Sequence, residues 1–260
     1  MAESTLSENP IQALLTVLGV AVVCALLVSV SAVKLRPHYV ANLEAHRLAQ
    51  LESILSALSG TVHEVAAENI ESRLVELTSG RYSDKFDPAT FDARKAATDP
   101  GGSTPIPPDH DIAGIQRREK HATVFLVRDA DGGVALIILP VRGSGYQSSL
   151  YGFLALAGDT STVVALKFYE QGDTPGMGAR IQDPSWEALW PGKRVYDDAG
   201  ALRIGVARGR LTPGSMDAEH MVDGISGATR TSQGVHDLLR FWLGDFGFGP
   251  FLERVRRGEG

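Results

Sequence analysis

The chain has 260 residues, of which 43% are hydrophobic and 22% are charged, and its formal net charge is −6. This length and apolar content suit one or two domains with a sizeable core. The charges are spread without a dense Lys/Arg stretch, which argues against nucleic acid as a partner. The single cysteine, Cys24, excludes an internal disulfide, and the seven histidines show no ligand spacing, so we predict no protein-bound metal.

The first element is an apolar stretch over residues 11–33, which carries no charge and one strongly polar side chain, Gln12. Roughly 20 such residues suffice to cross a bilayer core of about 30 Å as a helix. A buried soluble helix would show a polar face, and a secretory signal peptide would need a basic start, whereas residues 1–10 hold no Lys or Arg. Small residues near the end of the stretch leave cleavage open as an alternative. We predict a short tail over 1–10 and a retained single transmembrane helix over 11–33.

The charges beside this helix bear on its orientation. Lys34 and Arg36 follow it, and nothing basic precedes it. By the positive-inside rule, these two charges favour a cytoplasmic location for the C-terminal part of the chain.

The segment 34–110 is predicted to be a juxtamembrane helical region followed by an irregular connection. An apolar helical period over 51–58 predicts that a helix emerges from the membrane, and Gly60 interrupts it. Loose periodicity predicts a second short helix over 64–79. From 79 to 111 the composition shifts to Gly, Pro, Asp and Ser, which is typical of a long surface connection.

A β-rich core follows, within a predicted domain over residues 111–260. The β-branched runs 122–127 and 134–141 flank a Gly/Asp turn, and so do 150–156 and 163–169, which predicts two hairpins. A fifth strand is expected at 202–207. Strands with helices at both ends indicate an α+β domain with a mostly antiparallel sheet and flanking helices.

Two glycine loops border these strands. The first, Gly143–Ser148, lacks the third glycine and the crossover helix of a dinucleotide-binding fingerprint. The second, Asp173–Gly178, places Pro175 before Gly176 and so favours a tight turn. Each loop alone fits a structural turn as well as a ligand-binding segment.

The most informative motif is the run Ser226-Gly227-Ala228-Thr229-Arg230-Thr231, which precedes an amphipathic helix. Apolar residues recur with helical spacing at 235, 238, 239 and 242, and Gly244 follows, where a helix end is expected. Thr231 or Ser232 is therefore expected at or near the N-cap, and a helix N-terminus favours an anion such as a phosphate. The plain alternative is that these residues form only a cap and a turn. The sequence places no histidine or carboxylate to activate Thr231, so an accessory enzyme would have to attach any group there.

This run resembles the S-G-A-T-x-T signature at which flavin mononucleotide (FMN) is esterified to the last threonine, here Thr231. Over essentially its whole length the chain resembles the C subunit of the sodium-translocating NADH:quinone oxidoreductase. The segments that carry the resemblance are Leu35-Arg36-Pro37, Leu150–Leu156, Tyr169–Gly178, Pro184-Ser185-Trp186 with Trp190, Val222–Gly224, Ser226–Thr231 and Phe241–Phe251. Two positions depart from the family's E-T-P-G-L-G pattern, at Asp173 and Met177, and both changes are conservative.

The resemblance implies an electron-transfer subunit with covalent FMN on Thr231, attached by a separate flavin transferase. It implies a bacterial inner-membrane protein with one span and a periplasmic soluble domain, against the two-charge argument from Lys34 and Arg36. The partners implied are membrane lipid and the other members of a six-subunit complex, with the B subunit as electron acceptor and the D and E subunits as membrane neighbours. No residue of this chain is expected to be catalytic, because the flavin carries the redox chemistry. The expected FMN contacts, besides Thr231, are Ser226, Gly227, Ala228, Thr229, Thr174, Gly176, Met177 and Gly145.

Three other interpretations remain beside this one. The G subunit of Rnf-type ferredoxin:NAD oxidoreductases shares the span and the flavin signature. A membrane-tethered FMN-binding module would use the flavin without relaying electrons. A hydrolase with Ser226 or Thr231 as nucleophile lacks a partnered base in the sequence.

Overall fold

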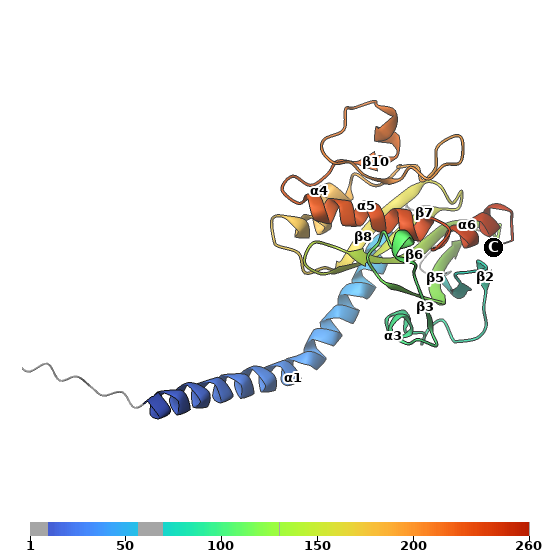
Figure 1. The fold of residues 1–260 in the computed structure, drawn as a ribbon. Helices are drawn as coiled ribbons and strands as arrows, with labels where there is room; N and C mark the ends of the chain where they lie inside the picture. Colours follow the sequence, from blue (N-terminus) through green and yellow to red (C-terminus); the bar gives the residue numbers. More distant parts are fainter. Residues whose placement is uncertain (1–9, 57–69, 130, 260) are drawn as a thin grey trace, which may run out of the picture. The chain divides into compact units, whose positions relative to one another are not determined.

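The structure is a computed structural model, and it describes residues 10–56, 70–129 and 131–259. The chain forms two compact units, Met1–Arg47 and Leu48–Gly260 (Figure 1).

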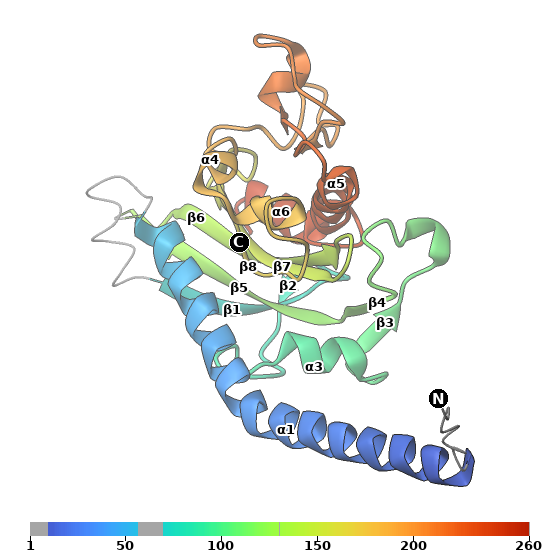
Figure 2. The same cartoon turned by 90° about the vertical axis from the view of Figure 1, so that its left-hand side faces the viewer.

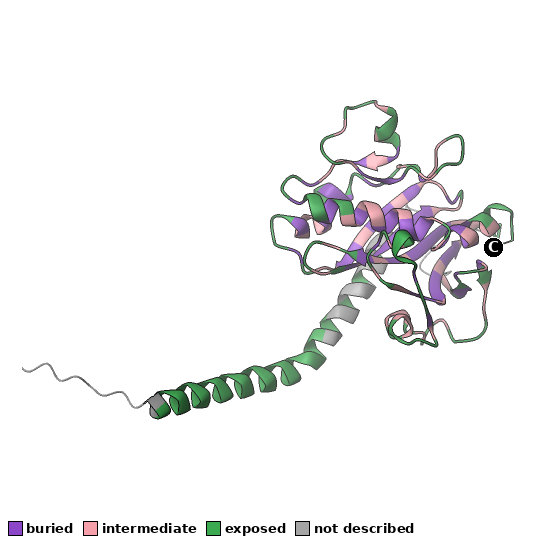
Figure 3. Ribbon diagram, viewed as in Figure 1, coloured by how far each residue is buried: buried purple, intermediate pink, exposed green. Residues whose placement is uncertain are grey.

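The N-terminal unit is built on helix α1, which spans Pro10–Ser56 and so continues beyond the unit's end. Its segment Ala13–Tyr39 has a mean hydropathy of 2.8 and is long and apolar enough to cross a membrane. Apolar side chains from Ile11 to Tyr39 are exposed, as Figure 3 shows in green. The helix that we expected beyond the apolar segment is present as far as Ser56, whereas Leu58 and Gly60 lie outside the described residues.

The second unit contains a six-stranded antiparallel sheet with the strand order β2-β1-β5-β6-β7-β8. The four long strands predicted from β-branched runs are confirmed, and so are the two hairpins, β5–β6 and β7–β8. The strands span Ile70–Glu76 (β1), Arg81–Tyr82 (β2), His121–Arg128 (β5), Val134–Ser144 (β6), Ser149–Ala157 (β7) and Val163–Glu170 (β8).

The C-terminal helices α5 (Thr229–Leu243) and α6 (Gly249–Arg256) cover one face of this sheet. The predicted apolar positions of α5, Val235, Leu238, Leu239 and Trp242, are all buried in the main core. Figure 2 shows α5 and α6 on one side of the sheet, with the short helix α3 (Ala93–Thr98) on the other. Helix α5 packs chiefly on β6, so its N-terminus is held beside one end of the sheet.

The prediction of a helix over 64–79 is wrong for the residues that the structure describes, which begin at Ile70. Residues Ile70–Glu76 form β1, which pairs with β5 from Ile70↔Val127 to Glu76↔His121. Leu74, Val75 and Leu77 have almost no exposed surface. Pairing with a strand far along the chain decides the conformation here, and local periodicity carries no information about it.

The stretch 79–111 is less irregular than expected. It contains β2, α3, β3 (Ser103–Pro105) and a 3-10 turn at Pro108–His110, and β3 pairs with β4 (Arg117–Glu119). The predicted boundary of the C-terminal domain at residue 111 stays a prediction.

The strand expected at 202–207 is reduced to β9 (Gly205–Val206), which pairs in parallel with β10 (Met221–Val222). Leu202 takes part only in an isolated bridge with Tyr196. The remaining elements are α4 (Pro184–Glu187) and 3-10 helices at Gly178–Gln182 and Met216–Glu219. The unit is thus an α+β domain with a mostly antiparallel sheet, as predicted.

Candidate functional site

Three segments that are distant in sequence meet at the start of α5. They are the turn between β6 and β7, the loop that follows β8, and the run that ends at Thr231. Asp173, in the loop after β8, joins them: it accepts hydrogen bonds from the backbone N–H groups of Tyr146 (3.2 Å) and Gln147 (2.8 Å) and from the Thr231 hydroxyl (2.6 Å). Asp173 and Thr231 are both buried, with 4% and 1% of their surface exposed.

The electrostatics of Asp173 follow from this arrangement. Burial by itself would raise the pKa of its carboxyl group. The hydrogen bond from Thr231 and those from the backbone of the β6–β7 turn outweigh burial, so the pKa lies below its ordinary value. Asp173 is therefore a carboxylate at neutral pH.

The start of α5 refines the sequence prediction, which expected Thr231 or Ser232 at or near the N-cap. The helix begins at Thr229 with Ala228 as N-cap, so Thr231 lies near the N-cap as the third helical residue, and neither residue is the N-cap itself. The Ser232 hydroxyl accepts a hydrogen bond from the N–H of Ile225 at 3.0 Å and fixes the preceding turn instead. Within the described residues no side chain caps the N-terminus of α5, so its first N–H groups have no side-chain acceptor from a capping residue.

Gly178 makes the close approach between the loop and the helix possible. A Cβ atom at this position would lie 2.5 Å from Thr231 Oγ1 and 2.7 Å from Asp173 Oδ2. Both distances are shorter than real Cβ contacts, so a larger residue would force Thr231, Asp173 or the loop itself to shift.

A hollow of about 320 Å³ opens onto this cluster. Its rim carries two exposed side chains of the kind that pack on a flat ring, Tyr146 (58% exposed) and Met177 (47% exposed). The Arg230 guanidinium lies 5.5 Å from the centre of the Tyr146 ring. The lining residues are Tyr146, Asp173, Thr174, Met177, Gly178, Gly227, Ala228, Thr229, Arg230 and Thr231.

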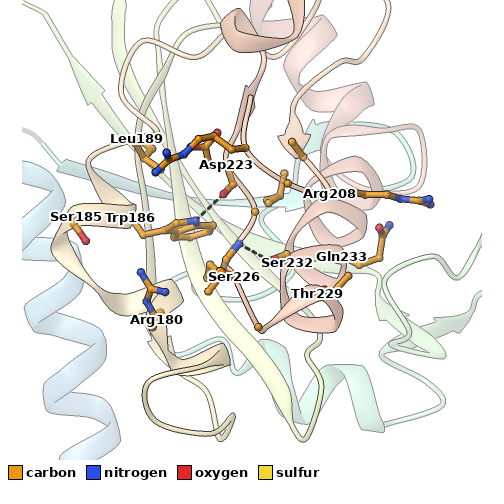
Figure 4. Close-up of a pocket in the computed structure, with 17 residues that line it drawn as sticks. Arg180, Ser185, Trp186, Leu189, Arg208, Asp223, Ser226, Thr229, Ser232 and Gln233 are labelled. Atoms are coloured by element: carbon orange, nitrogen blue, oxygen red, sulfur yellow. Dashed lines mark hydrogen bonds and ion pairs between the residues drawn. The ribbon is translucent and has the colours of Figure 1, made fainter. Parts of the chain in front are cut away.

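A larger hollow of about 670 Å³ also borders the Ser226–Thr231 run (Figure 4). Trp186 lies in its wall and donates from Nε1 to the carbonyl oxygen of Asp223 at 3.1 Å. Arg180 and Arg208 reach it from different segments, and the exposed Ser226 lines it. Thr231 does not line this larger hollow and lines only the smaller one, so any group on its side chain would be expected in the smaller hollow.

The structure brings together most of the residues expected from the sequence. Thr174, Met177, Gly227, Ala228, Thr229 and Thr231 line the smaller hollow, whereas Ser226 lines the larger one. Gly145 and Gly176 line neither. Gly145 lies in the β6–β7 turn against Asp173, and Gly176 has a φ of +76°, which a glycine adopts easily.

Sequence reasoning misses the most direct partner of Thr231. The sequence predicts Asp173 only as part of a ring-contact loop and places no carboxylate near Thr231, yet the two side chains are hydrogen-bonded across 58 positions. It also gives no signal for Tyr146. The described residues contain no group of three or more His, Cys, Asp or Glu side chains placed to hold a metal ion.

Comparison with known proteins identifies the family. Residues 145–244, from the β6–β7 turn to the end of α5, match the FMN-binding domain family. The C subunit of the Na(+)-translocating NADH-quinone reductase of Pseudomonas aeruginosa is 44% identical over 261 residues, which cover 97% of this chain and 98% of that protein. The chain belongs to the family of NADH-quinone reductase C subunits.

Further relatives of this family agree in sequence and in fold. The C subunit of the same reductase from Vibrio alginolyticus is 42% identical over 94% of both chains. The crystal structure of Shewanella oneidensis NqrC superposes with a TM-score of 0.71 at 32% identity, over 82% of this chain and 98% of that one. The C subunit from Parabacteroides distasonis superposes with a TM-score of 0.55 at 25% identity, over 84% and 94%. The predicted family and fold are thus confirmed.

Proposed function

We propose that this chain is the membrane-anchored electron-transfer subunit of a sodium-translocating NADH:quinone oxidoreductase and carries FMN esterified through its phosphate to Thr231. The observation that carries the proposal is the position of Thr231 in the first turn of α5, where this residue lines a hollow inside the segment that matches the FMN-binding domain family.

The residues around Thr231 fit a phosphate followed by a flat ring system. A helix start without a side-chain cap offers N–H groups and the positive end of the helix dipole to a phosphate. Arg230, exposed beside it, adds a positive charge. Met177 and Tyr146 offer apolar surface at the rim of the hollow, and Thr174 lines the hollow as a hydrogen-bonding group.

When bound, FMN supplies one- and two-electron chemistry. The chain's own residues then have three tasks: to tether the group through Thr231, to orient it with the helix start and Arg230, and to limit its contact with water with Met177 and Tyr146. Covalent linkage prevents loss of the cofactor from an exposed domain. None of these residues has to donate or accept a proton during electron transfer.

The setting that we propose is the bacterial inner membrane, with α1 as the single span and the second unit in the periplasm. The partners are the other five subunits, with the B subunit receiving electrons and the D and E subunits as membrane neighbours, and a separate flavin transferase that loads Thr231. An alkaline phosphatase fused after Gly260 is expected to be active in cells. An inactive fusion would place the domain in the cytoplasm, as Lys34 and Arg36 alone would predict.

The test of the cofactor is in-gel flavin fluorescence. The full chain is produced with a flavin transferase as wild type, as Thr231→Ala and as Thr229→Ala, a matched change two positions away at an exposed hydroxyl. We expect fluorescent denatured bands for the wild type and for Thr229→Ala and a dark band for Thr231→Ala. A dark wild-type band, or a Thr231→Ala band that still fluoresces, would reject Thr231 as the attachment residue.

A further inference from the structure

The run Ser226–Thr231 offers three hydroxyl groups, and the structure distinguishes them by their surroundings. Ser226 and Thr229 are exposed, and within the described residues neither is hydrogen-bonded to a carboxylate. Thr231 is buried, and its hydroxyl donates to Asp173 Oδ2 at 2.6 Å. The O–H bond of Thr231 is therefore oriented toward Asp173, and the lone pairs of the oxygen point away from that carboxylate.

We propose that Asp173 is the proton acceptor for Thr231 when the flavin phosphate is attached, and that it selects this hydroxyl among the three. The inference rests on the proposed attachment at Thr231 and adds a chemical role for a residue of the acceptor chain itself. The transferase supplies the donor, and the acceptor chain supplies an oriented nucleophile with a base in contact.

The reaction has to balance. FMN alone is a poor donor, because forming an ester from its monophosphate would require the loss of hydroxide. The donor is therefore a flavin dinucleotide, in which the FMN phosphate is joined to a second nucleotide by a pyrophosphate bond. Thr231 Oγ1 forms the new P–O bond, the bond from that phosphorus to the bridging oxygen breaks, and the electron pair leaves with the second nucleotide monophosphate. The hydroxyl proton passes to Asp173 Oδ2 and then to solvent.

A carboxylate suits this step although it is a weak base. Protein kinases likewise use an aspartate to accept the proton of the attacking substrate hydroxyl. The hydrogen bonds from Tyr146 and Gln147 hold the Asp173 carboxylate in place. Thr231 lines the smaller hollow together with Thr174 and Met177, and this hollow is the approach that we propose for the donor phosphate.

The chain contains a matched control for this carboxylate. Asp159 accepts the hydroxyl of Thr162 at 2.5 Å and two backbone N–H groups at 2.8 Å, in the turn between β7 and β8. Its pKa is also lowered, with burial opposing and hydrogen bonds prevailing. Asp159 thus accepts the same kinds of hydrogen bond as Asp173, although it is exposed, and Thr162 lies outside the motif.

The experiment measures the initial rate of flavin incorporation into the purified full chain, with a flavin transferase and flavin adenine dinucleotide. Flavin is quantified by in-gel fluorescence and by the mass of the intact chain. We expect Asp173→Asn to slow incorporation by about 100-fold or more, within the usual contribution of a positioned acid or base. Asp173→Glu, which keeps the carboxylate, is expected to retain most of the rate, and Asp159→Asn to match the wild type.

Each outcome decides the question. Equal rates for Asp173→Asn and the wild type, or equal slowing by Asp159→Asn, would overturn the role of Asp173 while labelling of Thr231 continues. No labelling of the wild type would instead reject the proposed function. If Asp173→Asn fails to fold by tryptophan fluorescence, Gly178→Ala tests the same contact. Its Cβ clashes with both the hydroxyl and the carboxylate and so disturbs their hydrogen bond but removes neither group. An undiminished rate in that variant would also overturn the proposal.

Discussion

Gly234, in the middle of α5, offers the sharpest test of how the site is held together. Alanine is the better helix former by about 1 kcal/mol, so propensity alone predicts that Gly234→Ala stabilises the protein. A Cβ atom at this position, however, would lie 2.3 Å from the carbonyl oxygen of Ser144 and 3.5 Å from Gly145 Cα. Both neighbours are backbone at the end of β6, so no side chain can rotate away to relieve the contact.

The clash is expected to outweigh propensity. Overpacking costs about 1–3 kcal/mol. Because this contact is with backbone that cannot rotate away, we expect about 2–3 kcal/mol, which leaves a net loss of about 1–2 kcal/mol after the helix gain. For a unit of this size that corresponds to a fall in Tm of roughly 2–8 °C. The β6–β7 turn has to withdraw from α5, which also weakens the hydrogen bonds from Tyr146 and Gln147 to Asp173.

Thermal unfolding of the full chain in detergent, followed by tryptophan fluorescence, measures this loss. All three tryptophans are buried in the second unit, so the signal reports on that unit. Gly209→Ala is the control, because a Cβ atom there meets no heavy atom within 4 Å. We expect it to be neutral or slightly stabilising. A Gly234→Ala variant as stable as the wild type, or more stable, would refute the close approach of α5 to the turn.

Two further predictions concern the same helix. Trp242 is 1% exposed and donates from Nε1 to the Arg142 carbonyl oxygen at 2.6 Å. Trp242→Phe should therefore lower the free energy of unfolding, measured by urea denaturation, by about 1–3 kcal/mol. An unchanged urea midpoint would contradict this packing. Burial lowers the pKa of His236, whose Nδ1 accepts the Val206 N–H at 3.2 Å. Because the folded pKa lies below the unfolded one, the contribution of His236 to stability is complete above about pH 6.5 and is lost as the pH falls through the folded pKa. Urea denaturation at neutral and at mildly acidic pH should show this loss of stability in the wild type. The loss should be smaller in His236→Gln. Part of it should remain there, because burial also lowers the pKa of His121. An equal acid loss in both proteins would reject the assignment.

Local contacts explain which parts of the fold were predictable. The strands β5 to β8 are β-branched runs joined by Gly/Asp turns, so hairpin partners lie close in the chain. The apolar face of α5 and its end before Gly244 were likewise predictable from spacing. The pairing of β1 with β5 was not, because its two strands lie far apart in the sequence and Ile70–Glu76 carries only a weak local pattern.

The candidate site likewise combines features that local sequence predicts with features that depend on distant contacts. The motif predicts Thr231 as the site residue. The start of α5 at Thr229 was harder to predict, because its N-cap is Ala228 and not one of the usual capping residues Ser, Thr, Asp or Asn. The Asp173–Thr231 hydrogen bond depends on the β8 loop, the β6–β7 turn and α5 meeting in space, which no spacing in the sequence encodes.

The buried Asp173–Thr231 hydrogen bond has a consequence for how the protein is assembled. In the unmodified chain the threonine proton satisfies part of the hydrogen-bonding demand of a buried carboxylate. Under the proposed function, esterification of Thr231 would remove that proton and set a phosphodiester anion beside the same carboxylate, and like charges this close repel. The loaded domain would therefore differ from the unloaded one in the hydrogen bonds around Asp173, and the loop after β8 is the segment that would have to adjust.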